Sequence, residues 1–344
     1  QKTAYEIYQC DWSSDVCSSD LDGWKEFNFW HDTHQVISKE LSNVAQRFPN
    51  TKFILFTSCE SLELELSEPN LHIVPWGGDL VNQRLQYQDL EPVFNKNFNS
   101  NKPFICLNRN RRDHRIVTLS YLFGNGYTKH GYVSYLSNQR IDTQYEPKDF
   151  LDRISWEFNE DGSHDKPRDA LLDGYEKMMH YTRSAPADDY EIYSDTFGEN
   201  DNVTNFNLRL RPKYENSFVE IVSESTFCAP AFNITEKTSN AFIACNFPIL
   251  LGGSGIVQHM RDLGLDMFDD IVNHNYDYIT NPFDRIVTAI DDNHQLLTDI
   301  DYVKGKWKEC VPRFESNIKL IRNIHDWYDA RTKRVYNEVI QNIC

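Results

Sequence analysis

The stretch that decides the fold is Asn233-Ile234-Thr235-Glu236-Lys237-Thr238, with Phe247-Pro248-Ile249-Leu250-Leu251-Gly252-Gly253 following shortly after it. Thr235 is a favourable N-cap residue, which predicts a helix from Thr235 to Ala244. The apolar run from Pro248 to Leu251 predicts a buried strand that ends in glycines. A helix that leads into a buried strand is the repeating unit of a parallel α/β sheet, so we expect an α/β fold.

The same alternation occurs upstream of this stretch. Short apolar runs predict strands, and apolar residues at helical spacing predict helices. The predicted strands are Lys52–Thr57, Leu71–Pro75, Pro103–Leu107, Gly131–Leu136 and Phe218–Val222. The predicted helices are Thr33–Phe48 and His114–Phe123. Strands that alternate with helices in this way favour doubly wound parallel sheets.

Two stretches depart from this alternation. Residues 147–212 are polar, acidic and irregular, with aromatic islands such as Tyr175–Tyr181, and we expect an insertion or long connections there. After Pro312 apolar residues return at helical spacing, which predicts one or two amphipathic terminal helices.

We expect two domains, since 344 residues are enough for both. Residues 1–21 are set apart as a candidate non-native segment, because Asp15–Leu21 reads like a translated sequencing adapter, as in a gene from environmental assembly. The Asn-rich run Asn95–Lys102 is the expected domain boundary. The predicted units are an N-terminal domain at 22–100, a second domain at 101–315 with the insertion at about 147–212, and C-terminal helices at 316–344.

Composition restricts the classes of function. With 35 Lys+Arg against 52 Asp+Glu, the net charge of −17 disfavours non-specific nucleic-acid binding, although a locally basic groove is compatible with it. The eight cysteines show no C-x-x-C spacing, and Cys106 and Cys245 are expected to be small buried hydrophobes. We find no secretory signal and no run of about 18 apolar residues. A cytoplasmic protein without a membrane partner is expected.

The Thr235–Lys237 segment has the local chemistry of a site for a sugar-linked diphosphate. A diphosphate gains charge as the sugar leaves, and helix N-termini, Arg and Lys meet that need. Thr235 at a helix start and Lys237 in its first turn fit this role, and Glu236 can accept hydrogen bonds from ribose hydroxyls. The alternative is an ordinary capped helix whose first turn happens to be charged.

Three other loops are predicted to begin at the same edge of the sheet, at the carboxyl ends of its strands, where open α/β sheets bind ligands. Arg109 and Arg112 lie in the basic loop that follows Asn108, and Arg suits bidentate phosphate contacts. Glu224 follows another strand and can bind a ribose or the donor sugar, and its neighbours Ser223 and Ser225 can bind phosphate or sugar. Gly252 and Gly253 permit close approach of a ligand to the backbone, or merely a tight turn. The alternative for the basic loop is a solvated surface turn.

The first domain supplies the candidates for the acceptor side. An inverting transfer needs a general base near neutral pKa to activate the acceptor hydroxyl. The eligible catalytic residues are His31, Asp32, His34 and Asp79. Each can equally be a helix cap. The H-x-x-H pattern lacks the following Glu of a zinc helix, so no metal site is predicted.

In this order the motifs resemble the nucleotide-sugar-binding half of fucosyltransferase-like and exostosin-like glycosyltransferases with the GT-B fold. They resemble still more closely the glycosyltransferases of tailed bacteriophages and giant viruses. The resemblance covers roughly residues 100–300, and the first domain matches less well. It rests on the segments 104–115, 234–237, 248–253, 261–264 and 268–270.

The resemblance implies an α/β GT-B protein, with two Rossmann-like doubly wound domains facing a cleft and a C-terminal helix that crosses back. It implies a UDP- or GDP-linked sugar donor held by the second domain, with no divalent metal. One departure is Thr238–Ala241, where relatives usually carry a bulkier aromatic or basic residue. The implied donor-site residues are Asn108, Arg109, Arg112, Glu224, Thr235, Glu236 and Lys237.

For the acceptor, the viral resemblance favours a hydroxymethylated base in DNA, such as 5-hydroxymethylcytosine. The target base would then have to be flipped out or single-stranded. The acidic charge argues for a glycan or protein acceptor instead. A non-catalytic nucleotide-sugar-binding protein with the same fold is the third reading.

Overall fold

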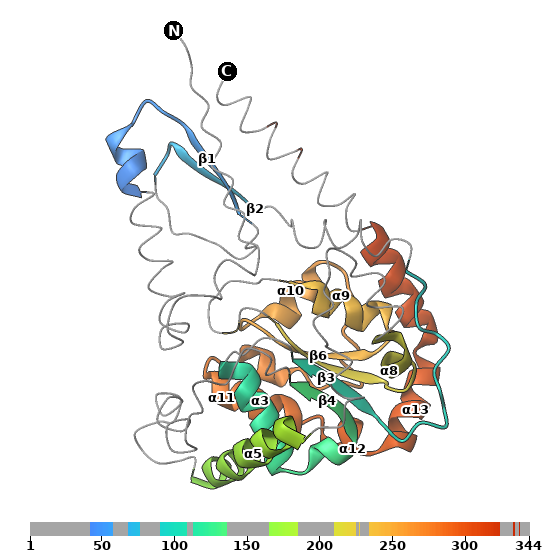
Figure 1. Cartoon of the computed structure of the whole chain (residues 1–344). Helices are drawn as coiled ribbons and strands as arrows, with labels where there is room; N and C mark the ends of the chain where they lie inside the picture. Colours follow the sequence, from blue (N-terminus) through green and yellow to red (C-terminus); the bar gives the residue numbers. More distant parts are fainter. Residues whose placement is uncertain are drawn as a thin grey trace.

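The computed structural model describes residues 42–57, 68–75, 90–108, 113–135, 165–184, 210–224, 227, 234–323, 333 and 337. These residues form a mixed α/β structure around a four-stranded parallel sheet (Figure 1). Its strands are β3 (Phe104–Asn108), β4 (Gly131–Tyr135), β5 (Val219–Ser223) and β6 (Phe247–Leu251). The strands β1 (Phe53–Thr57) and β2 (Leu71–Pro75) form a second parallel pair. All six agree with the predicted strands to within one residue at each end.

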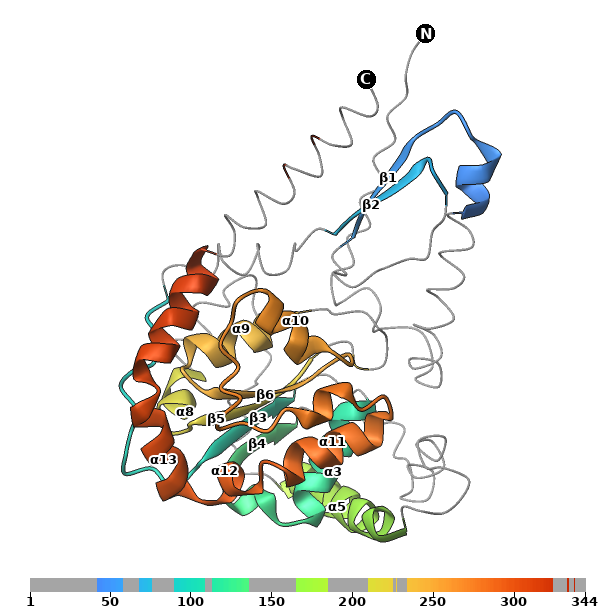
Figure 2. The ribbon, with the colours of Figure 1, turned by 180° about the vertical axis from the view of Figure 1, so that it is seen from behind.

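The strand order β4-β3-β5-β6 determines where the helices lie. The chain moves from β3 to one side of the sheet and from β5 to the other, so right-handed crossovers place their helices on opposite faces. Figures 1 and 2 show α9 (Glu236–Ile243) and α10 (Ile256–Asp262) on one face. They show α3 (Asp113–Gly124) and α11 (Pro282–Asp291) on the other.

The core around the four-stranded sheet is built on both of its faces. All five residues of β5 and of β6 are buried, as expected for parallel strands covered by helices on both sides. Phe247 packs against Phe268 and Phe314 with ring centroids 5.0 and 5.2 Å away. Helix α13 (Ile300–Glu309) is anchored by Trp307, whose Nε1 donates a hydrogen bond of 2.6 Å to the carbonyl of Cys245. Cys245 and Cys106 are buried as predicted, and burial raises the pKa of each thiol to about 12.

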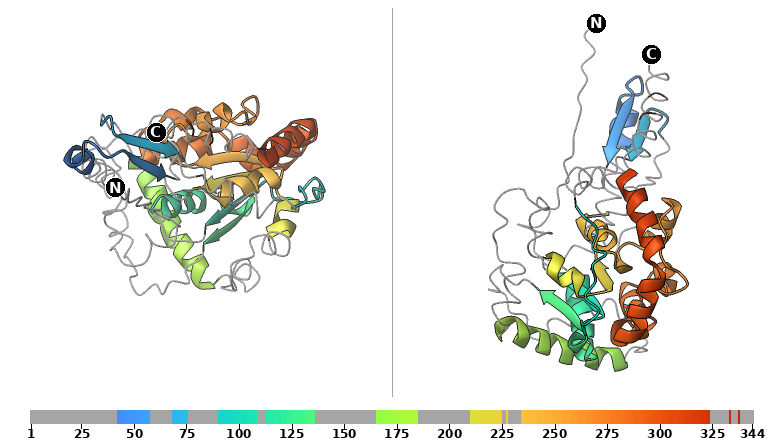
Figure 3. Two further views of the ribbon diagram at one scale, coloured as in Figure 1. Left: turned by 90° about the horizontal axis from the view of Figure 1, so that it is seen from above. Right: turned by 90° about the vertical axis from the view of Figure 1, so that its right-hand side faces the viewer.

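Part of the predicted insertion is a regular helix, whereas the sequence analysis expected irregular structure there. Residues Asp165–Ser184 form the long helix α5, which lies against α3 (Figure 3). Leu171, Tyr175 and Met178 form its buried stripe. The two helices approach closely because Gly174 lies against the backbone of α3, where a Cβ would overlap the carbonyl oxygen of Ser120. The rest of the predicted insertion lies outside the described residues, apart from the start of α8 (Arg211–Glu215) and the residue before it.

A C-terminal helix is present as predicted, with helical residues from 311 to 323. Phe314 and Ile318 are buried on it. The Arg322 guanidinium donates a hydrogen bond of 2.9 Å to the carbonyl of Leu90, which precedes β3. The last described turn of this helix therefore contacts the segment that leads into the four-stranded sheet. The remainder of the predicted C-terminal region lies outside the described residues, apart from two single helical positions.

Candidate functional site

The strand order creates a switch point between β3 and β5. These two parallel strands are neighbours, with Phe104 opposite Val219, but the chain leaves them toward opposite sides of the sheet. Open α/β sheets bind ligands in the crevice at the carboxyl ends of two such strands. Here those ends are Asn108 and Ser223. The predicted donor-site residues at 108–112 and at 224 therefore follow the two strands that flank the switch point.

On the α3 face of this edge, the first turn of α3 holds the end of β5. The buried Arg115 donates from Nη2 to the carbonyls of Ser223 and Glu224, at 3.2 and 3.4 Å. His114 Nε2 lies 2.9 Å from the Glu224 carbonyl and, in the tautomer that protonates Nε2, donates to it. The His114 ring also stacks on Phe227 with centroids 4.9 Å apart. The two side chains fix the start of the β5–α9 loop.

Arg285 on α11 performs a similar task at the end of β6. It is 2% exposed, and its Nη1 donates to the carbonyl of Gly252 at 2.6 Å and to that of Phe227 at 3.2 Å. Its guanidinium also lies over the Phe227 ring, 4.6 Å from the centroid. Arg285 and His114 therefore both contact Phe227. With Arg115, Arg285 also gives the α3/α11 face of the edge two buried guanidinium groups.

On the opposite face, the carboxylate of Glu224 closes the start of α9. Its Oε1 accepts hydrogen bonds from the Thr235 backbone N–H at 3.0 Å and from the Thr238 hydroxyl at 2.5 Å. Its Oε2 accepts one from the Thr235 hydroxyl, also at 2.5 Å. Glu224 is fully buried, so a negative charge already sits where a helix N-terminus attracts anions. Its predicted contact with a ribose stays a prediction and would compete with these three bonds.

Thr235, Glu236 and Lys237 form the predicted first turn of α9, with Thr235 as its N-cap. Lys237 Nζ donates to Glu236 Oε1 at 2.8 Å and to the Thr235 hydroxyl at 3.0 Å. Burial alone would raise the pKa of the Glu236 carboxyl, but the Lys237 ammonium and the Arg115 guanidinium lower it below its usual value. Charges from the starts of α9 and α3 thus act on one carboxyl.

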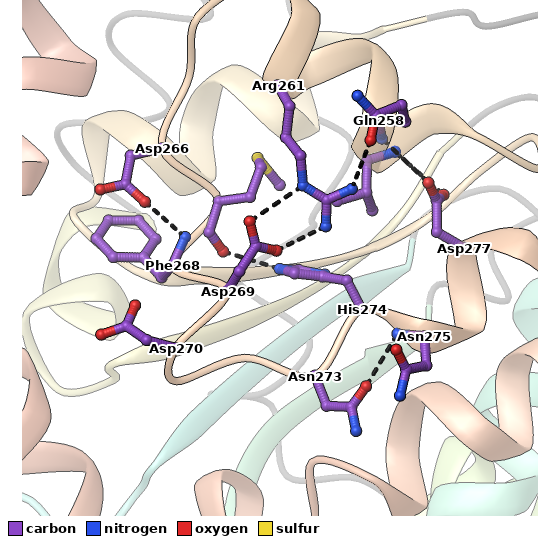
Figure 4. A network of polar contacts seen from close by, with 12 residues as sticks. Gln258, Arg261, Asp266, Phe268, Asp269, Asp270, Asn273, His274, Asn275 and Asp277 are labelled. Atoms are coloured by element: carbon purple, nitrogen blue, oxygen red, sulfur yellow. Dashed lines mark hydrogen bonds and ion pairs between the residues drawn. The ribbon is translucent and has the colours of Figure 1, made fainter.

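The start of α10 is closed by a second internal carboxylate. Asp277 is 1% exposed and accepts hydrogen bonds from the backbone N–H groups of Val257 and Gln258, at 3.1 and 3.0 Å. Figure 4 shows this contact beside the Arg261–Asp269 ion pair, in which Arg261 Nη2 lies 2.6 Å from Asp269 Oδ1. The helices that follow β5 and β6 therefore both begin at a carboxylate of the protein itself.

The two predicted glycines lie in the turn from β6 into α10. A Cβ at Gly252 would come within 2.6 Å of Ile256 Cδ1 and within 3.6 Å of the Glu224 Cβ. The Gly253 carbonyl accepts a hydrogen bond of 3.1 Å from the Ile256 N–H. These contacts support the tight-turn reading for both, and Gly252 adjoins Glu224 at the candidate site.

Two polar side chains at the switch point are buried without a hydrogen-bond partner for one of their atoms. Within the described residues, these atoms are Asn108 Oδ1 and Ser223 Oγ. The Asn108 amide nitrogen lies 3.3 Å from Cys106 Sγ, a weak acceptor. Unpaired buried polar atoms are rare in native structures because they forfeit hydrogen bonds to water. Each atom therefore has hydrogen-bonding capacity that the described residues leave unused.

The structure thus brings together Asn108, Glu224, Gly252 and the first turn of α9 at one edge of the sheet. The other predicted residues, Arg109, Arg112, His31, Asp32, His34 and Asp79, lie outside the described residues. Sequence reasoning missed Arg285 and Asp277 because each acts on a segment distant in sequence. His114 and Arg115 belonged to the resembling motif, but without an assigned role.

Comparison with protein-family profiles, curated proteins and solved structures gave no significant match to this chain. None of the described helices combines the length and apolar content needed to span a bilayer. The described residues contain no group of three or more His, Cys, Asp or Glu side chains placed to hold a metal ion.

Proposed function

We propose that this protein is a nucleotide-sugar-dependent glycosyltransferase of GT-B architecture. In this proposal the four-stranded sheet belongs to the donor domain, and the β1–β2 pair belongs to a second Rossmann-like domain that supplies the acceptor side. The observation that carries the proposal is the switch point, because it places Asn108 and Ser223, each with an unpaired buried atom, at neighbouring strand ends.

The chemistry of the edge supports an anionic ligand that also carries hydroxyl groups. The buried guanidinium groups of Arg115 and Arg285 lie on one face, and the Lys237 ammonium lies at the start of α9. Arg109 and Arg112, which directly follow β3 in sequence, would complete the positive charge around a leaving diphosphate. The donor is a UDP- or GDP-linked sugar, and basic side chains take the part that a metal plays in other transferases.

The acceptor is the part of the proposal that rests on the sequence resemblance alone. That resemblance favours a hydroxymethylated DNA base, with a glycan or protein hydroxyl as the alternative. Four residues, His31, Asp32, His34 and Asp79, remain the proposed general-base candidates.

The test is product analysis by mass spectrometry. The protein is incubated with a panel of UDP- and GDP-sugars and with hydroxymethylcytosine-containing DNA, unmodified DNA, free glycans or protein. Transfer to one acceptor supports the proposal and names the acceptor. Arg109→Gln should lower turnover at least a hundredfold, because it removes a bidentate phosphate contact. Lys306→Gln, at a cation on α13 paired only with Glu309 among the described residues, is the control.

Tight binding of a nucleotide sugar without transfer to any acceptor and without hydrolysis would instead indicate a non-catalytic binding protein. Absence of both binding and turnover with every donor would overturn the proposal.

A further inference from the structure

The sheet edge is electrostatically asymmetric. On the side of α9 and α10, the buried carboxylates of Glu224 and Asp277 accept the hydrogen bonds of the helix starts. On the side of α3 and α11, the buried groups are the guanidinium groups of Arg115 and Arg285. A diphosphate is repelled by the first pair and attracted by the second. The sequence analysis assigned phosphate contacts to the start of α9 and to the loop after Asn108, and it did not choose between the two faces of the sheet.

The unpaired hydroxyl of Ser223 belongs to the positive side. Side chains alternate between the two faces along a strand. The Glu224 side chain points to α9, where it contacts Thr235 and Thr238, so the preceding Ser223 side chain points to the α3 face. Arg115 on α3 donates to the Ser223 carbonyl, which places the guanidinium beside the same residue.

Asn108 lies on the same face of the neighbouring strand. Its neighbour Leu107 packs against the cluster that contains Ile105 and the α9 residue Ile243, so the alternating side chain of Asn108 points to the opposite, α3 face, as does that of Cys106. A Ser hydroxyl donates to a phosphate oxygen, and an Asn carbonyl oxygen accepts from a sugar hydroxyl. This pair of unsatisfied groups matches a phosphate linked to a sugar or ribose.

We infer that the diphosphate of the donor binds on the α3/α11 face of the switch point, against Ser223 and Asn108, and not at the start of α9. This inference rests on the proposed function and assigns the anion subsite within it. Glu224 then acts as a positioning residue. Its carboxylate accepts hydrogen bonds from the first turn of α9. Its backbone carbonyl accepts hydrogen bonds from His114 and Arg115. In this arrangement Lys237 contacts a part of the donor other than the diphosphate.

Isothermal titration calorimetry with inorganic pyrophosphate, UDP and GDP tests the inference. Ser223→Ala should weaken pyrophosphate binding about tenfold, the usual effect of losing one hydrogen bond to a charged group. It should leave the melting temperature unchanged, because within the described residues the hydroxyl has no partner to lose. Ser120→Ala is the matched control, since Ser120 also has a buried unpaired hydroxyl but lies seven residues into α3. The pyrophosphate affinity of Ser120→Ala should stay within twofold of the wild-type value.

Lys237→Met distinguishes the two locations. If Lys237→Met loses less pyrophosphate affinity than Ser223→Ala does, the inference is supported. A larger loss, with UDP or GDP still bound by wild type, overturns the inference and leaves the proposed function standing. Binding of pyrophosphate through Ser223 without binding of any nucleotide supports the anion subsite and overturns the proposed function. Failure of wild type to bind all three compounds overturns both.

Asn108→Asp is the second variant. It places a carboxylate on the same face and should weaken pyrophosphate binding at least tenfold through like-charge repulsion, with folding verified by circular dichroism. Unchanged pyrophosphate affinity in both Asn108→Asp and Ser223→Ala would overturn the inference.

Discussion

The Glu224 carboxylate and the Thr238 hydroxyl, fourteen residues apart in sequence, are joined by a buried hydrogen bond of 2.5 Å. With the two bonds from Thr235, this contact ties the end of β5 to the first turn of α9. A fully buried carboxylate is tolerated only when donors of this kind surround it. The order of the candidate site therefore depends on one acidic side chain that points away from the proposed anion subsite.

Removal of this carboxylate should be costly. Glu224→Ala leaves three buried donors without their acceptor and is expected to lower the free energy of unfolding by about 3 kcal/mol. Thr238→Val removes one of the three bonds and should cost about 1 kcal/mol. Glu309→Ala, on an exposed carboxylate of α13, should change the value by less than about 0.5 kcal/mol. Urea denaturation measures all three, and equal effects of Glu224→Ala and Glu309→Ala would contradict the structural role.

The stability should depend on pH through Glu220. This residue of β5 is 3% exposed, and its carboxyl accepts a hydrogen bond from the Tyr214 hydroxyl. Burial raises the pKa of the Glu220 carboxyl from 4.5 to about 8. Between about pH 4.5 and 8 the unfolded chain is ionised at this position while the folded protein keeps the proton. The contribution to stability is thus fully present below pH 4.5 and is lost as the pH rises to about 8.

Glu220→Gln should remove this dependence. The slope of unfolding free energy between about pH 5 and 8 should become less negative than in wild type, by at most about 1.4 kcal/mol per pH unit. Thermal melts across this range, with the exposed Glu309→Gln as control, supply the measurement. Parallel curves for Glu220→Gln and wild type would show that Glu220 is already ionised in the folded protein.

The α3–α5 contact should be intolerant of a single methyl group. Gly174→Ala would drive a Cβ into the carbonyl oxygen of Ser120, which is rigid backbone, and is expected to cost about 3 kcal/mol. Gly305→Ala on α13 is the matched control, because a Cβ there meets no atom of the described structure within 4 Å. It should stabilise the protein by about 0.5–1 kcal/mol through helix propensity. An unchanged melting temperature for Gly174→Ala would refute the close packing of α5 on α3.

Lys96 should be essential for attaching the segment before β3. Its buried Nζ donates to the carbonyls of Tyr214, Ser217 and Ala244 and to Asn246 Oδ1, all at 2.6–2.8 Å. Lys96→Met leaves these acceptors without a donor and should cost about 3–5 kcal/mol. Lys102→Met, at a lysine whose exposed Nζ contacts one carbonyl, should cost less than about 1 kcal/mol. Denaturant midpoints that shift equally for the two would contradict the anchoring role.

The sheet could be predicted from sequence because parallel strands buried on both faces appear as short continuous apolar runs. Helix α9 was predicted as well, since Thr235 is a strong local cap signal. Helix α5 was missed because its buried stripe is narrow and Gly174 interrupts it. That glycine is explained only by the approach of α3, a long-range contact that local propensity does not contain.

For the candidate site, sequence identified the residues that directly follow strands, such as Asn108 and Glu224. Their surroundings depend on tertiary contacts. Arg285 reaches a carbonyl 58 residues away in sequence, and Asp277 closes a helix that begins 21 residues before it. No local pattern marks either residue as part of the edge. The charge asymmetry between the two faces could therefore be found only in the structure.

The strand order also has a consequence for synthesis on the ribosome. Strand β4 begins at Gly131, 23 residues beyond Asn108, whereas β5, the other neighbour of β3, begins at Val219, 111 residues beyond Asn108. At elongation rates of about 5–20 residues per second, one edge of β3 stays without its neighbour for roughly 6–20 s. Nascent chains that are arrested before Val219 should accordingly recruit chaperones that recognise apolar strands, and chains that extend past Leu251 should release them.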